Sequence, residues 1–124
     1  MGTIIPTLTK HSNTLTKLQL YWEDDLSLSF VSLFLNLQEI KFSSEMTMQS
    51  ENFELQYATF PKLQILKFPY GHPKAEHMMK FLEINGKNLH EFYICNNLNS
   101  ALNSSIAKFC PNLKSFSQYL IMMN

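Results

Sequence analysis

The chain has 124 residues, of which 45% are hydrophobic, and its ten Lys and Arg residues balance its ten Asp and Glu residues. This length suits one small domain with its own core. A net charge of zero gives no field that would draw the chain to nucleic acid or to an anionic membrane, so we expect neither as a partner. Cys95 and Cys110 form no C-x-x-C motif, which favours free thiols and a reducing compartment.

The first ten residues, MGTIIPTLTK, lack the basic start and the long apolar segment of a secretory signal. The longest apolar-rich stretch, residues 26–37, contains three serines and is shorter than the roughly 20 residues that span a membrane. The sequence therefore predicts a soluble chain that is cytoplasmic or nuclear.

A short apolar phrase recurs along the chain: FPKLQILKF at 60–68 and LNLQEIKF at 35–42 share the pattern L-Q-x-x-K-F. Aligning them along the chain gives five copies of an L-x-x-L-x-L core, whose first positions lie 22 to 26 residues apart. This spacing lies within the period of leucine-rich repeats, which is about 20 to 29 residues. The core positions are Leu15, Leu18 and Leu20; Leu37, Ile40 and Phe42; Leu63, Leu66 and Phe68; Leu89, Phe92 and Ile94; and Leu113, Phe116 and Gln118.

The residues around each core support this alignment over chance matches, which are frequent in so apolar a sequence. Asn36, Asn88 and Asn112 each directly precede the first leucine of a copy. Pro61 and Pro111 lie two positions before it. The copies therefore share a frame as well as a hydrophobic pattern.

The alternation of side chains along a strand explains the spacing of the apolar residues in the repeated segment. In a strand, Leu66 and Phe68 point into a core while Ile65 and Lys67 point the other way. One such unit cannot bury its apolar face alone, but stacked copies form a parallel sheet with a continuous interior. The repetition is therefore a condition for folding.

The segments between the cores have a different periodicity. Residues 24–35 open with two aspartates and predict a helix, whereas residues 45–60 show no clear stripe and predict irregular chain or short helical turns. Residues 73–85 predict a helix with Gly86 as its stop, and residues 98–110 predict another helix.

The sequence thus predicts a repeating unit in which a strand is followed by a helix or a turn. Connections of this kind between parallel strands are right-handed almost without exception. The predicted fold is an α/β leucine-rich-repeat solenoid of about five repeats, curved into an arc. A parallel sheet forms its concave face, and helices or irregular turns form its convex face. We expect residues 1–10 to be a lead-in or the remnant of a preceding repeat, residues 11–120 to be the repeat domain, and residues 121–124 to be a tail.

Residues capable of catalysis or metal binding occur without a supporting motif. None of the four histidines belongs to an H-E-x-x-H sequence, and the acidic WEDD at 22–25 fits a helix start better than a calcium loop. We therefore predict no catalytic residue, no metal and no cofactor. The alternative is a small hydrolase using His90 and Cys95. Against it, Cys95 is expected at the exposed end of the fourth strand, which favours an ordinary surface thiol over a nucleophile.

The copies CPNLKSF at 110–116, KNLHEFYI at 87–94 and FPKLQILKF resemble the leucine-rich-repeat region of F-box proteins, especially the large fungal sets. The resemblance covers roughly residues 11–120. It implies that the repeats hold a protein substrate for a cullin ubiquitin ligase, to which an F-box docks through a Skp-type adaptor. Residues 1–14 are too short for an F-box, so a Skp-type adaptor is a partner only if an F-box lies elsewhere.

The chain departs from the family's repeat pattern at a position that follows each core. The Asn or Cys expected three places after the third core residue occurs only as Asn97. The buried ladder of that position is therefore incomplete, and the turns must be satisfied in another way.

These observations predict a non-enzymatic protein-protein interaction module, the substrate-recognition region of an F-box-type ligase subunit, complete or truncated. The alternative is a structural repeat fragment with no independent role. Recognition is expected on the outward strand positions of the concave face, where tyrosines and one aliphatic residue accompany charges of both signs. These positions are Lys17, Gln19, Tyr21, Glu39, Lys41, Ile65, Lys67, Glu91 and Tyr93.

Overall fold

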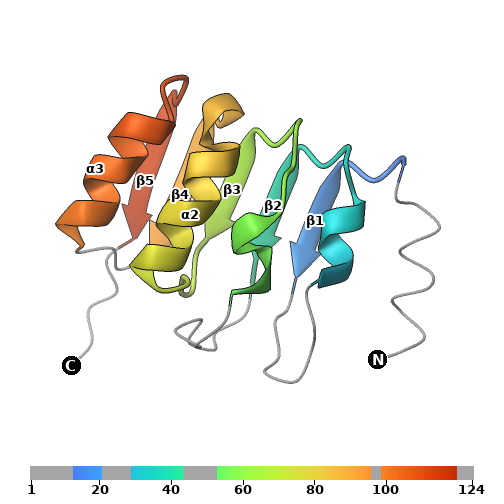
Figure 1. Ribbon diagram of the computed structural model, residues 1–124, viewed down its shortest axis with the longest axis horizontal. Coiled ribbons are helices and arrows are strands. Elements are labelled where there is room, and N and C mark those ends of the chain that lie inside the picture. Colours follow the sequence, from blue (N-terminus) through green and yellow to red (C-terminus); the bar gives the residue numbers. More distant parts are fainter. Residues whose placement is uncertain (1–12, 21–28, 44–52, 96–98, 120–124) are drawn as a thin grey trace.

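The computed structural model of the chain describes residues 13–20, 29–43, 53–95 and 99–119. Within these residues the chain is an α/β protein in which five parallel strands form one sheet, joined through two α-helices and three short 3-10 helices. Figure 1 shows the strands side by side, and the helical segments cover one face of the sheet.

The strands are β1 (Lys17–Leu20), β2 (Glu39–Phe42), β3 (Ile65–Phe68), β4 (Glu91–Cys95) and β5 (Ser115–Tyr119). The α-helices are α2 (Ala75–Asn85) and α3 (Ser100–Phe109), and the 3-10 helices are η1 (Ser29–Leu33), η2 (Glu54–Tyr57) and η3 (Gly86–Asn88). No helix within the described ranges is long and apolar enough to cross a bilayer.

Each strand pairs in parallel with the strand that follows it in sequence, in the order β1-β2-β3-β4-β5. Ile40 lies opposite Leu18 on one side and Leu66 on the other. Phe92 lies opposite Leu66 and Phe116. The second core residue of every copy therefore lies in one row across the sheet, as the alignment of the copies predicts.

A repeated backbone arrangement brings the strands into this register. The Thr16 carbonyl, just before β1, accepts hydrogen bonds from the N–H groups of Gln38 (2.7 Å) and Glu39 (3.1 Å) at the start of β2. The same arrangement recurs at the carbonyls of Gln38, Gln64 and His90. Each strand thus begins at the same height as its neighbour.

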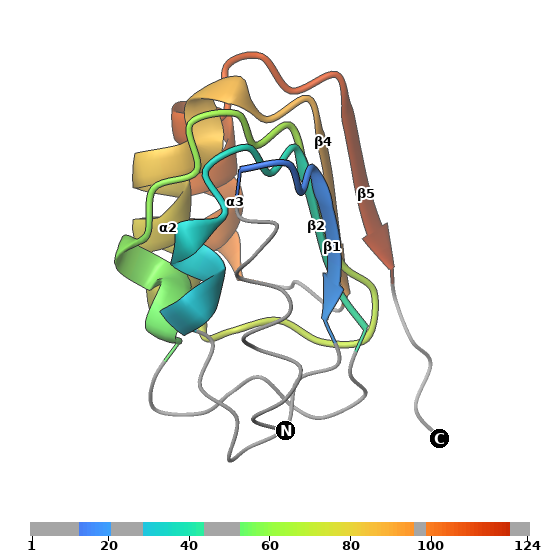
Figure 2. The same ribbon diagram turned by 90° about the vertical axis from the view of Figure 1, so that its right-hand side faces the viewer.

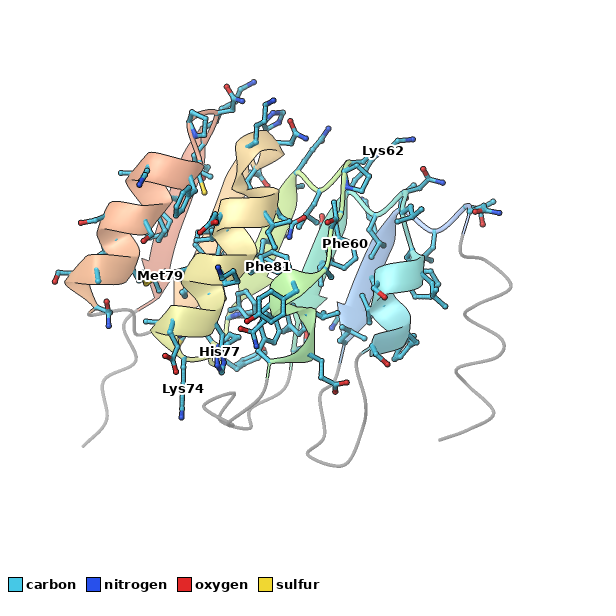
Figure 3. All side chains as sticks on the ribbon, in the orientation of Figure 1. Phe60, Lys62, Lys74, His77, Met79 and Phe81 are labelled. Atoms are coloured by element: carbon cyan, nitrogen blue, oxygen red, sulfur yellow. The ribbon has the colours of Figure 1, made fainter. Side chains whose placement is uncertain are left out.

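A row of side-chain amides joins the turns that precede the strands. The Nδ2 atoms of Asn36, Asn88 and Asn112 donate to backbone carbonyls of the preceding copy at 2.5 to 3.0 Å. Lys62 has the equivalent place in the third copy, at the edge seen in Figure 3, and its Nζ donates to Asn36 Oδ1 at 2.9 Å. The turns at this edge are therefore satisfied by the asparagines that share the frame of the repeat, while Asn97 lies outside the described residues.

The core lies between the sheet and the helical segments. Leu63, Leu66 and Phe68 are fully buried, as the hydrophobic pattern predicts. The rings of Phe42 and Phe68 stack with centroids 4.7 Å apart. Contacts between like positions of neighbouring copies thus make the interior continuous.

A buried asparagine connects α2 to the segment that leads into β3. Asn85 Oδ1 accepts a hydrogen bond from the Phe60 N–H (2.7 Å), and its Nδ2 donates to the Ala58 carbonyl (2.8 Å). The rings of Phe60 and Phe81 lie nearby with centroids 6.1 Å apart (Figure 3). Sequence reasoning missed Asn85, although a polar residue on the apolar face of a predicted helix is a signal for such a contact.

The two helices predicted at 73–85 and 98–110 are confirmed as α2 and α3. The side chain of Asn99 caps α3 by accepting a hydrogen bond from the Leu102 N–H at 2.9 Å. Gly86 ends α2 as predicted, but for another physical reason. Its φ is −70°, and a Cβ there would lie 2.5 Å from the carbonyl oxygen of Phe109, so glycine is required for the close approach of α3.

The helix predicted over 24–35 is wrong in its described part, which forms the 3-10 helix η1; residues 24–28 lie outside the described ranges. Val31 and Phe34 are both fully buried, and a spacing of three places them on one side of a 3-10 turn. The Ser32 hydroxyl also donates to the Ser29 carbonyl at 2.7 Å. The irregular chain or short helical turn predicted at 45–60 agrees with η2 in its described part, whereas residues 45–52 lie outside the described ranges.

Some core positions of the first and last copies are less buried than those of the central copies. Phe116 is 41% exposed, and Leu15 and Leu113 are half-buried, although Leu18 and Leu20 are buried. Among the described strands, β1 and β5 each have a neighbour on one side only. Phe116 on β5 therefore lacks the packing that a further strand would supply.

Candidate functional site

In Figure 2 the helical segments lie on one side of the strands. The residues that the sequence singled out alternate with buried core residues along the strands, so they lie on the opposite face of the sheet. In β2 and β3 the side chains alternate between half-buried and buried, so the outward set is accessible, as predicted. We call this surface the open face. It comprises Lys17, Gln19, Glu39, Lys41, Ile65, Lys67, Glu91 and Tyr93. The remaining predicted residue, Tyr21, lies outside the described part of the chain.

The sheet register arranges the open face into two rows. The first row runs through Lys17, Glu39, Ile65, Glu91 and Ser115. The second row runs through Gln19, Lys41, Lys67 and Tyr93. Because neighbouring strands lie about 4.8 Å apart, residues adjacent in a row are close enough to act on one ligand. The first row carries charges of both signs, whereas the only charged residues of the second row are Lys41 and Lys67.

One lysine connects the two rows. Lys67 Nζ lies 3.9 Å from Glu39 Oε2 and 5.4 Å from the centroid of the Tyr93 ring. Both side chains of the ion pair are partly exposed, so the pair contributes at most about 1 kcal/mol to stability. These contacts orient Lys67. Because 3.9 Å is too long for a hydrogen bond, the N–H groups of Lys67 are not hydrogen-bonded to Glu39.

A pocket of about 250 Å³ opens on the second row, lined by Lys41, Lys67, Pro69 and Tyr93. Pro69 follows β3 directly and was not among the predicted site residues. The signal for it was available, because continuing the alternation of Ile65 and Lys67 by one step places Pro69 on the same face. The pocket thus combines two ammonium groups with a ring and a rigid pyrrolidine.

Past the second row, toward the carboxyl ends of the strands, two of the outward side chains are buried. Ser43 and Cys95 continue the outward alternation of β2 and β4, but they are only 8% and 1% exposed. The accessible part of the open face is therefore the two rows and the pocket.

The expectation that Cys95 is an exposed surface thiol is wrong, because it is buried at the end of β4. Burial raises the pKa of the Cys95 thiol, which disfavours the thiolate that a nucleophile needs. His90 precedes the same strand, so the two residues lie roughly 16 Å apart along it. The structure thus does not bring His90 and Cys95 together. Both cysteines are free thiols, as predicted.

The helix-covered side offers a second pocket of about 370 Å³ between α2 and α3. Glu76, Glu83, Lys80 and Lys108 are among its lining residues, and their charges balance. It therefore has no single charge with which to select a ligand. Across the described ranges, no group of three or more His, Cys, Asp or Glu side chains is placed to hold a metal ion.

Comparison with protein-family models and with curated proteins finds no match to this chain.

Proposed function

We propose that this protein is a non-enzymatic protein-interaction module of the leucine-rich-repeat class, which binds a protein partner on the concave, open face of an arc-shaped solenoid. The observation that carries the proposal is the open face itself, where five in-register strands present two accessible rows. The repeat period of 22 to 26 residues supports the class.

The composition of the open face favours a protein over a small molecule as its ligand. Tyr93 and Ile65 supply partly exposed apolar contact area among charges of both signs, which is a typical protein-binding surface. The pocket on this face, at about 250 Å³, is smaller than the roughly 300 to 1,000 Å³ typical of small-molecule sites. An extended protein surface can use both rows, whereas a metabolite would use the pocket alone.

We further propose that the partner is a substrate of a cytoplasmic or nuclear cullin ubiquitin ligase. The resemblance of CPNLKSF, KNLHEFYI and FPKLQILKF to the repeats of F-box proteins supports this proposal. In such an assembly this chain is the substrate-recognition region, and an F-box outside residues 1–124 contacts the Skp-type adaptor.

Affinity capture with quantitative mass spectrometry tests both proposals. The tagged chain, a Tyr93→Ala variant and a helix-face control, Glu83→Ala, are compared for captured proteins. The proposal expects partners that are depleted by Tyr93→Ala and retained by Glu83→Ala. Equal capture by all three contradicts binding on the open face. Absence of a Skp-type adaptor from captures made with the full-length gene product removes the ligase while leaving the interaction module.

One observation favours a second candidate, a structural repeat unit that is stable only when packed on further repeats. Phe116 on the edge strand β5 is 41% exposed, although it occupies a core position of the repeat. Thermal melting and size-exclusion chromatography of the isolated chain test this candidate. A monomer with one cooperative transition counts against it, and a broad transition or self-association supports it.

A further inference from the structure

We propose that the pocket formed by Lys41, Lys67, Pro69 and Tyr93 binds the side-chain carboxylate of an acidic residue in a peptide segment of the partner. The inference rests on the proposed function, because it assigns the chemistry of the segment that the open face recognises.

Two like charges face the pocket from neighbouring strands. Lys41 and Lys67 lie directly opposite each other on β2 and β3, an arrangement that destabilises a sheet when nothing neutralises it. Glu39 Oε2 is 3.9 Å from Lys67 Nζ, which is beyond hydrogen-bond distance, and no ion pair to Lys41 occurs among the described residues. A carboxylate between the two ammonium groups would relieve this repulsion.

The size and lining of the pocket fit a single acidic side chain. Its volume of about 250 Å³ suits one side chain, and it is open at the surface of the sheet rather than enclosed within the core. Pro69 and the ring of Tyr93 form walls against which the methylene groups of a glutamate can pack. The pocket therefore matches an apolar stem that ends in an anion.

The carboxylates beside the pocket favour a peptide over a nucleic acid as its ligand. Glu39 and Glu91 lie in the row next to the lysines, two strands apart. A continuous phosphate backbone crossing the open face would meet these carboxylates and be repelled. A peptide can place one acidic residue over the lysines and neutral or basic residues over Glu39 and Glu91.

The test uses the whole chain and two fluorescein-labelled decapeptides that differ only at three central positions, which are glutamate in one and glutamine in the other. Fluorescence anisotropy gives their dissociation constants, and backbone amide shifts in NMR spectra locate the contact. We expect the glutamate peptide to bind about tenfold more tightly. The largest shifts should occur at Lys41, Lys67 and Tyr93. Equal affinities, no binding of the glutamate peptide at millimolar concentration, or shifts confined to α2 and α3 would overturn the inference.

Charge-matched variants separate a site from a general attraction to positive charge. Lys41→Gln and Lys67→Gln should each weaken the glutamate peptide about tenfold, because each removes one charge-assisted hydrogen bond. Lys80→Gln and Lys87→Gln on the helical segments change net charge equally and should leave affinity unchanged. Thermal melting confirms that all four variants fold. Equal weakening by all four contradicts the site.

Capture of the natural partner distinguishes failure of this inference from failure of the proposed function. If capture depends on Ile65 and Tyr93 but not on Lys41 and Lys67, the module binds its partner without the carboxylate, and the inference is wrong. If capture depends on none of the four residues, both proposals are wrong.

Discussion

At the residue scale, Asn85 is the polar group on which the contact between α2 and the approach to β3 depends. It is 4% exposed, and its amide pairs with the Phe60 N–H and the Ala58 carbonyl. Water cannot replace these bonds in so buried a place. The loss of Asn85 would therefore leave backbone groups with no partner, which costs more than the bonds themselves contribute.

We expect Asn85→Ala to lower the free energy of unfolding by about 2 to 4 kcal/mol, because the buried Phe60 N–H and the partly buried Ala58 carbonyl lose their partners. Urea denaturation measures the loss. Asn88→Ala is the control, since Asn88 makes one exposed hydrogen bond to the Pro61 carbonyl and should cost only about 0.5 to 1.5 kcal/mol. Equal losses for the two variants would contradict the role given to burial.

Cys110 makes stability depend on pH in the alkaline range. Burial raises its pKa from 9.0 to about 11. Below pH 9 the thiol is protonated in both folded and unfolded chains, so its contribution is constant. Between pH 9 and 11 only the unfolded chain releases the proton, and the free energy of unfolding falls as pH rises. Urea denaturation across this range should show a shallower fall for Cys110→Ala than for the wild type. Parallel curves would show that this thiol titrates normally.

At the element scale, the contact between α2 and α3 depends on the lack of a side chain at Gly86. A Cβ at this position would lie 2.5 Å from the Phe109 carbonyl oxygen and 2.9 Å from Cys110 Sγ. We expect Gly86→Ala to destabilise the chain by about 1 to 3 kcal/mol. Helix propensity alone predicts the opposite sign, a gain of up to about 1 kcal/mol. A stabilised variant in thermal or urea denaturation would therefore refute the close approach.

Substitutions on the two faces of strand β3 should affect stability very differently. Leu66→Ala should cost about 2 to 5 kcal/mol, because Leu66 is fully buried in the central strand β3. Lys67→Ala should change stability by no more than about 1 kcal/mol, since its ion pair is partly exposed. Urea denaturation of both variants checks the strand register. A large loss at Lys67 with little at Leu66 would show that the faces are assigned the wrong way round.

The strands could be predicted from the sequence because apolar and polar residues alternate in the repeated segment. Aligning its copies also gives the register between neighbouring strands. The segment at 24–35 could not, since its apolar residues fit an α-helix as well as the observed 3-10 turn, and the burial of Val31 and Phe34 decides between them. Phe116 occupies a core position of the repeat but is 41% exposed, for a related reason. Its hydrophobicity is local, but its burial depends on a neighbouring strand.

The residues that form the rows of the candidate site could be predicted from the sequence. The extent of its accessible surface could not. The shared frame of the copies places Lys41 beside Lys67, which the register confirms. Alternation also places Cys95 on the open face, yet this thiol is buried. Accessibility at the carboxyl ends of the strands depends on tertiary packing, which a single strand pattern does not contain.

At the scale of the whole molecule, one repeated requirement produces both the fold and the open face. Each copy must bury its apolar residues against the next, so the strands align in register. The same register gathers the outward residues into rows. The apolar positions that recur in every copy thus determine the fold. The equivalent outward position is Glu39 in one copy and Ile65 in the next, and such variation is what a recognition surface requires.

The central claim is that a protein partner covers the open face, and lysine footprinting tests it most directly. Lys41 and Lys67 lie on this face, and Lys80 and Lys87 lie on the helical segments α2 and η3. Reductive methylation of the free chain and of its captured complex, read by mass spectrometry, compares the four rates. The account predicts that labelling of Lys41 and Lys67 falls severalfold in the complex while labelling of Lys80 and Lys87 is unchanged. Protection of Lys80 and Lys87, with Lys41 and Lys67 still fully labelled, would contradict it.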